Sequence, residues 1–88
     1  MRSKEFVRAV EDMTNYLREK VDAIPDEESK VNLLQDVFLI VSAQNIARMK
    51  KKELDELRHI LMYKGPGGFS VETMIDALSL FTAQQWAN

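Results

Sequence analysis

Residues 31–41 have the sequence VNLLQDVFLIV, and eight of these eleven positions carry large apolar side chains. An amphipathic surface helix keeps its apolar residues within one stripe, whereas these positions occupy most of the circumference of a helix. Such a helix must be surrounded, either by other helices of its own chain or by a second copy of the chain. The stretch therefore predicts a helical bundle with the helix over about residues 27–45 at its centre.

The preceding segment, residues 3–24, predicts an amphipathic helix. Its apolar residues recur every three or four positions and so share one face, with charged residues between them. The apolar positions are Phe6, Val10, Met13, Leu17, Val21 and Ile24. Pro25 disfavours helical geometry at the residue before it, and Asp26 is a typical N-cap of a new helix, so we expect the chain to turn here.

The end of the central helix is marked less sharply. Ile46, Ala47 and Met49 continue the helical spacing, so the alternative is one uninterrupted helix of about 35 residues. We favour a break near residues 49–51, because the acidic residues from Glu53 onward would then stabilise the N-terminal turn of a new helix. This choice predicts a third helix over about residues 51–63.

The loop at residues 65–68, Gly-Pro-Gly-Gly, separates the third helix from a fourth. Ser70 is a typical N-cap, and Phe69 and Met74 have the spacing of a hydrophobic staple. These signals predict a helix over residues 71–86. The glycines form a hinge on which this helix could swing towards a partner.

The fold class that follows is all-α: one domain over residues 1–88, a compact bundle of four short helices with antiparallel neighbours, or three if the second and third are continuous. The composition agrees, with 45% apolar residues, 30% charged residues and only five Gly plus Pro. The chain has no cysteine, and its longest apolar run, residues 37–41, is far short of the roughly 20 residues of a membrane span. We expect a cytoplasmic protein, of a size that suits a bacterial or phage accessory protein.

Residues for catalysis are sparse. His59 is the only histidine, and Asp55 and Glu56 lie four and three positions before it, where a carboxylate could reach its ring on a helix. This set supplies at most two metal ligands and no nucleophile. The loop at residues 65–68 follows a helix and not a strand, unlike a nucleotide-binding loop. We predict no enzymatic activity, no cofactor and no metal.

Basic residues concentrate in residues 48–64, which carry six Lys or Arg against three Asp or Glu, although the net charge of the chain is −2. A nucleic-acid-associated regulator is therefore the alternative function. Its candidate binding residues are Arg48, Lys50, Lys51, Lys52 and Arg58. The predicted fourth helix has no Lys or Arg, so it is not a DNA recognition helix.

The surplus of apolar residues is the stronger indication. Small helical domains often compensate for a small core by oligomerising, and five methionines provide adaptable contact surface. We therefore predict a small non-enzymatic regulatory or adaptor protein that binds a protein partner through an apolar helical surface, as a homodimer. The candidate partner-binding residues lie on the fourth helix: Met74, Leu78, Phe81 and Trp86.

Overall fold

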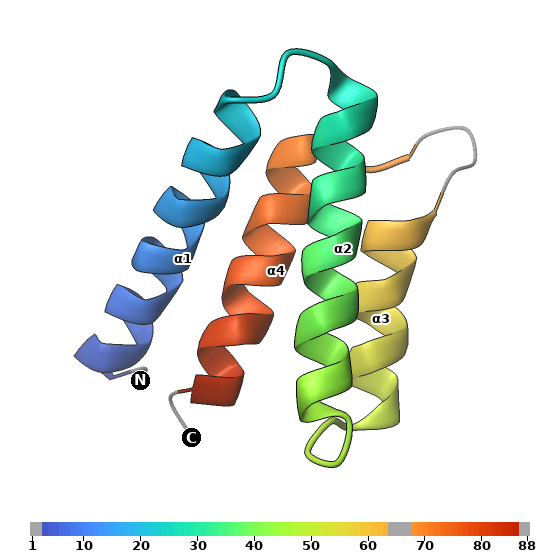
Figure 1. The fold of residues 1–88 in the computed structure, drawn as a ribbon. Helices are drawn as coiled ribbons and strands as arrows, with labels where there is room; N and C mark the ends of the chain where they lie inside the picture. Colours follow the sequence, from blue (N-terminus) through green and yellow to red (C-terminus); the bar gives the residue numbers. More distant parts are fainter. Residues whose placement is uncertain (1–2, 64–67, 87–88) are drawn as a thin grey trace.

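The computed structural model describes residues 3–63 and 68–86, which contain four α-helices. These are α1 (Lys4–Asp22), α2 (Glu27–Asn45), α3 (Lys51–Met62) and α4 (Val71–Trp86). Consecutive helices run antiparallel (Figure 1). The predicted all-α bundle is confirmed, and the interruption between α2 and α3 excludes the continuous helix. Residues 65–67 of the predicted loop and the side chain of Trp86 lie outside the described residues.

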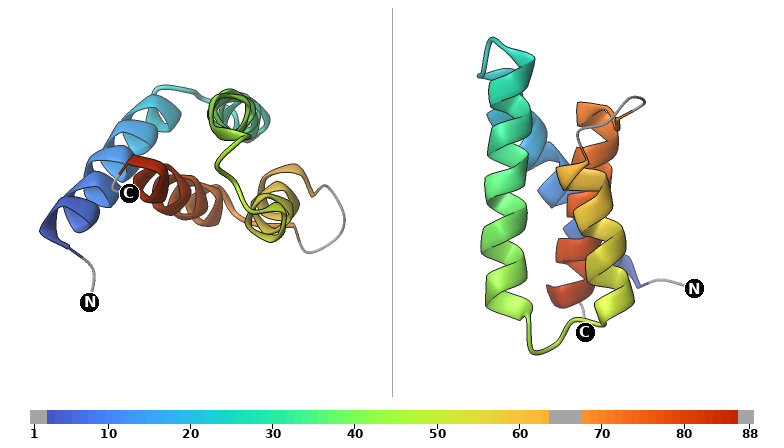
Figure 2. Two further views of the ribbon diagram at one scale, coloured as in Figure 1. Left: turned by 90° about the horizontal axis from the view of Figure 1, so that it is seen from below. Right: turned by 90° about the vertical axis from the view of Figure 1, so that its right-hand side faces the viewer.

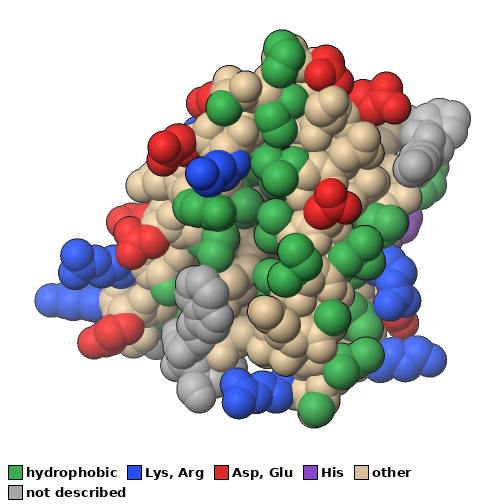
Figure 3. Space-filling model, viewed as in Figure 1, with side chains coloured by type: hydrophobic (Ala, Val, Ile, Leu, Met, Phe, Trp, Pro, Cys, Tyr) green, Lys and Arg blue, Asp and Glu red, His purple; other side chains and the backbone are tan. Residues whose placement is uncertain are grey.

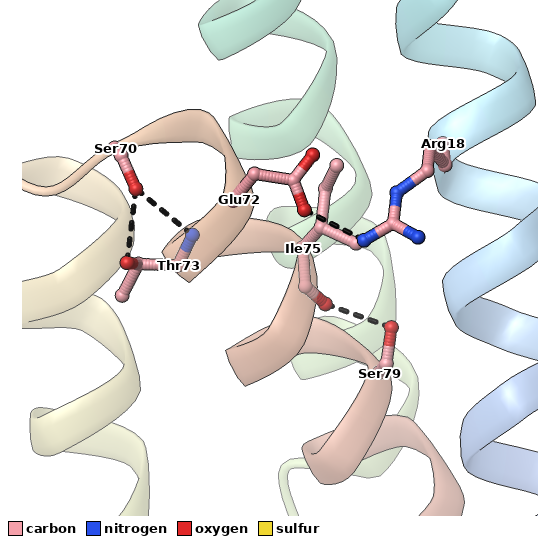
Figure 4. A network of polar contacts seen from close by, with 6 residues as sticks. All are labelled: Arg18, Ser70, Glu72, Thr73, Ile75 and Ser79. Atoms are coloured by element: carbon pink, nitrogen blue, oxygen red, sulfur yellow. Dashed lines mark hydrogen bonds and ion pairs between the residues drawn. The ribbon is translucent and has the colours of Figure 1, made fainter.

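Three of the four helices begin at a side-chain cap. Ser3 accepts a hydrogen bond from the backbone N–H of Phe6, and Asp26 accepts one from Ser29 at 2.9 Å. Hydrogen bonds from the side chain and then the backbone of Ser29 lower the pKa of Asp26. Ser70 caps α4, with its Oγ 3.2 Å from the backbone N of Thr73 (Figure 4). The caps predicted at positions 26 and 70 are confirmed, whereas Lys50, at the N-cap position of α3, makes no side-chain capping hydrogen bond.

The helix that the others surround is α4. It packs against all three other helices, most extensively against α1, and it lies between α1 on one side and α2 with α3 on the other (Figure 2). Five of its residues have at most 1% of their surface exposed: Ile75, Leu78, Ser79, Thr82 and Ala83. The expectation that the helix over residues 27–45 lies at the centre is therefore wrong.

Two hydroxyl groups are buried in α4 without being left unpaired. Ser79 Oγ donates to the carbonyl oxygen of Ile75 at 2.7 Å (Figure 4). Thr82 Oγ1 donates to that of Leu78, also at 2.7 Å. Because each hydroxyl is satisfied within its own helix, its burial carries no penalty for a lost hydrogen bond. Helix α4 is thus deeply buried although its sequence contains polar residues.

The central position of α4 leaves α2 with one buried side. Leu34 and Phe38 are buried, whereas Leu39 and Ile40 are 51% and 58% exposed. Helices α1 and α2 make their few contacts near their connection and diverge away from it (Figure 1). The far half of α2 consequently has no neighbour on its outer side within the described part of the chain.

Polar contacts join the helices at their ends. Arg18 on α1 forms an ion pair with Glu72 in the first turn of α4 at 2.6 Å (Figure 4). This hydrogen bond and the charge of Glu72 raise the pKa of Arg18. From α2, Lys30 Nζ donates to the carbonyl of Val21 at 2.6 Å and Gln35 Nε2 donates to that of Leu61 at 3.0 Å. These carbonyls belong to the last turns of α1 and α3, where helices lack internal donors.

Replacing Phe38 with alanine should destabilise the protein strongly, because the ring is 1% exposed within the core. We expect a loss of about 3–5 kcal/mol in the free energy of unfolding, measured by urea denaturation. Leu39→Ala is the matched control: the adjacent, half-exposed side chain should change the same quantity by about 0.5 kcal/mol or less. Equal losses for the two variants would contradict the assignment of inner and outer sides of α2.

Candidate functional site

The residues predicted to bind a partner lie inside the core. Met74, Leu78 and Phe81 are 3%, 0% and 5% exposed, and they pack in one cluster with residues of all three other helices. The side chain of Trp86 is not among the described residues. In this conformation the three buried side chains hold the bundle together. Their contact with a partner stays a prediction that requires α4 to leave its place.

An exposed apolar surface is found instead on α2 and the turn that follows it. Its residues, which we name the outer face of α2, are Leu39, Ile40, Ala43, Ile46 and Ala47, all of them exposed. Ile46 is 68% exposed, more than any other large apolar side chain in the described residues. Sequence analysis noted this apolar circumference but missed which part of it faces outward. The missed signal is the absence of charge: residues 37–47 contain no Asp, Glu, Lys or Arg.

Charged residues mark both ends of this surface. Asp36 precedes the uncharged run and is exposed, and Arg48 follows it. In the view of Figure 3, apolar side chains gather over the half of α2 nearer the α2–α3 connection, with basic side chains along the lower edge of the molecule. The outer face is therefore an apolar surface with an acidic residue at one end and basic residues at the other.

The candidate nucleic-acid-binding residues lie at one end of the bundle. Four of them form what we name the basic turn, Arg48, Lys50, Lys51 and Lys52, and all four are exposed. Arg48 and Lys50 line an open hollow of about 590 Å³ together with Glu53, Gln84 and Gln85. The fifth, Arg58, is also exposed and pairs with Asp55 at 3.5 Å. Because acidic residues interleave with these cations, binding to nucleic acid through them stays a prediction.

His59 contacts aromatic rings. Its ring centroid lies 5.1 Å from that of Tyr63 and 5.5 Å from that of Phe69. Asp55, which could have reached His59, pairs with Arg58 instead. Among the residues that the structure describes, no group of three potential metal ligands is found, and each buried side-chain nitrogen or oxygen has a hydrogen-bond partner.

Two further depressions have walls that combine apolar and polar side chains. One, of about 350 Å³, lies between α2, α3 and the start of α4, with Phe69 and Met74 of the predicted staple in its wall. The other is a groove of about 310 Å³ along α3 and α4, where Ile60 and Leu80 are flanked by Glu53 and Glu56. The second is an apolar surface with acidic edges, distinct from the outer face of α2.

Comparisons with known proteins add no assignment to these surfaces. No protein-family model, no curated protein and no solved structure matches this chain. In the described part of the chain, no helix is both long and apolar enough to cross a membrane. The functional argument therefore rests on the physical properties of the surfaces themselves.

Leu78→Ala should show whether α4 belongs to the core in solution. The side chain is fully buried, so we expect a loss of about 2–5 kcal/mol in the free energy of unfolding. Leu80→Ala on the same helix is the control, since Leu80 is 37% exposed and should cost far less. If Leu78→Ala leaves stability unchanged in chemical denaturation, α4 is detached in solution and its apolar residues are available to a partner.

Proposed function

We propose that this chain is a small non-enzymatic regulatory or adaptor protein, which binds protein partners through the outer face of α2 and acts as a homodimer. The observation that carries the proposal is the uncharged run at residues 37–47, whose outward residues are exposed along a regular helix and the turn after it. The monomer's core accounts for Val37, Phe38 and Val41 of this run, but it leaves the large apolar side chains of Leu39, Ile40 and Ile46 exposed to solvent.

Physical chemistry supports binding at this surface. Single exposed apolar residues are ordinary, but a contiguous group is typical of an interaction site. Leu39, Ile40 and Ile46 are each more than half exposed, and their side chains are within one or two helical turns of each other. Covering a group of this kind releases about 25 cal/mol for each Å² of apolar surface removed from water. A helix presenting such residues on a rigid element is a common form of protein recognition.

The other surfaces support the proposal less well. The groove along α3 and α4 has fewer large apolar side chains that are exposed, and the acidic residues Glu53 and Glu56 flank it. The basic turn is exposed but is followed at once by Glu53, which weakens attraction to phosphates. The outer face of α2 alone combines large exposed apolar side chains with an absence of charge.

A comparative pull-down from an extract of the native cells, quantified by mass spectrometry, tests the proposal. Ile40→Asp places a charge in the middle of the outer face and should reduce capture of a specific protein at least tenfold. Val7→Asp is the matched control, because Val7 is a 46% exposed apolar residue on α1 surrounded by Lys4, Arg8 and Glu11. The control should retain the wild-type level of capture, and circular dichroism should show both variants folded.

Three results would contradict the proposal. If the Ile40→Asp variant captures as much of the same protein as the wild type does, the outer face of α2 does not bind that protein. A loss caused only by Leu80→Asp would assign binding to the groove along α3 and α4. Loss of capture with rising salt, but not with Ile40→Asp, would indicate the basic turn and a nucleic-acid function.

A further inference from the structure

We infer that the outer face of α2 is covered by the same face of a second copy of this chain, with the two α2 helices antiparallel and a two-fold axis passing near Ala43. The inference rests on the proposed function and specifies its partner and geometry.

The outer face has two seven-residue spacings centred on Ala43. Seven residues separate Leu39 from Ile46, and likewise Ile40 from Ala47, so each pair occupies one flank of α2 and of the turn that directly continues it. Ala43 lies between the two flanks. Repeats of seven residues on a helix are the pattern by which two helices pack along their length.

An antiparallel two-fold arrangement pairs these residues with complementary sizes. About an axis at Ala43, Leu39 of one copy and Ile46 of the other lie on the same flank and differ in level by one residue, about 1.5 Å. By the same operation, Ile40 and Ala47 lie together on the other flank with the same offset. The two Ala43 side chains meet at the axis, where their small size permits close approach of the helices. The surface is thus complementary to itself, as an isologous interface requires.

Charge selects the antiparallel orientation. Asp36 lies seven residues before Ala43, and Lys50 lies seven residues after it, within the basic turn. An antiparallel pair therefore brings each Asp36 to the level of the basic turn of the other copy, twice by symmetry. A parallel pair would instead place Asp36 beside Asp36 and one basic turn beside the other. Asp36 forms no ion pair with any residue that the structure describes, so it is available for this contact.

The length of the surface sets the expected strength. From Asp36 to the end of α2 at Asn45 the surface extends about 14 Å, and with the following turn it is still too short to bury the roughly 800 Å² per partner of a standard interface. We expect a reversible dimer with a dissociation constant in the micromolar range, and not an obligate one.

Sedimentation equilibrium on charge-reversed variants tests orientation and partner together. The wild type should dimerise at about 100 µM. Asp36→Lys should raise the dissociation constant about tenfold, because it replaces two attractive contacts by repulsive ones. The combined variant with Asp36→Lys, Lys50→Glu and Lys51→Glu should restore association to near the wild-type value. Restoration is specific to the antiparallel pair, since a parallel pair would remain repulsive in all three positions.

Single-cysteine variants give a second measurement that does not depend on charge. The chain has no native cysteine, so Ala43→Cys introduces one thiol per copy. Two thiols at the axis should form a disulfide on mild oxidation, whereas the thiols from Asp36→Cys would lie about 21 Å apart and should not. Val7→Cys, on α1, is the control without cross-linking.

The inference is overturned by a wild type that remains monomeric up to about 1 mM. It is also overturned if the triple variant associates more weakly than Asp36→Lys alone, or if Asp36→Cys cross-links as fast as Ala43→Cys. A monomeric wild type whose protein capture is nevertheless lost in Ile40→Asp would refute the dimer, and of the proposed function it would leave the binding of another protein through the outer face of α2. Failure of both experiments would refute the two together.

Discussion

The burial of α4 by the other three helices is the constraint on which the rest of the structure depends. A chain of 88 residues can surround only one helix with the other elements it has, because its surface is large relative to its volume. Helix α4 is the one that the others surround, and its residues Ile75, Leu78, Ser79 and Thr82 are buried. Helices α1, α2 and α3 then each have one inner and one outer side, whatever the composition of their outer sides.

Local signals in the sequence were sufficient for the helices themselves. Pro25 and Asp26 mark the turn between α1 and α2, and Ser70 marks the start of α4, because caps and proline act through groups only a few residues away. The break after α2 could also be predicted, from the acidic residues in the first turns of α3. Each of these features depends on the chain within one or two turns, so a single sequence carries it.

The arrangement of the helices could not be predicted in the same way. The dense apolar stretch at residues 31–41 favours α2 as the centre, since Ser79 and Thr82 interrupt the apolar pattern of α4. Their hydroxyls bond to carbonyls one turn earlier, however, and are as easily buried as apolar groups of the same size. For the same reason Met74, Leu78 and Phe81 appeared free for a partner, whereas they contact the core. Which helix is buried depends on contacts between distant segments, which periodicity does not record.

The structure of the monomer accounts for the apolar residues on only one side of α2. Its inner side, with Leu34 and Phe38, is accounted for by the core. Its outer side, with Ile40 and Ile46, is exposed, and no apolar residue there contributes to the buried cluster. If a second copy covers the outer face, as we propose, α2 becomes a helix buried on both sides. The core explains the inner half of the stretch at residues 31–41, and association would then explain the run without charge that begins at residue 37 and continues past it.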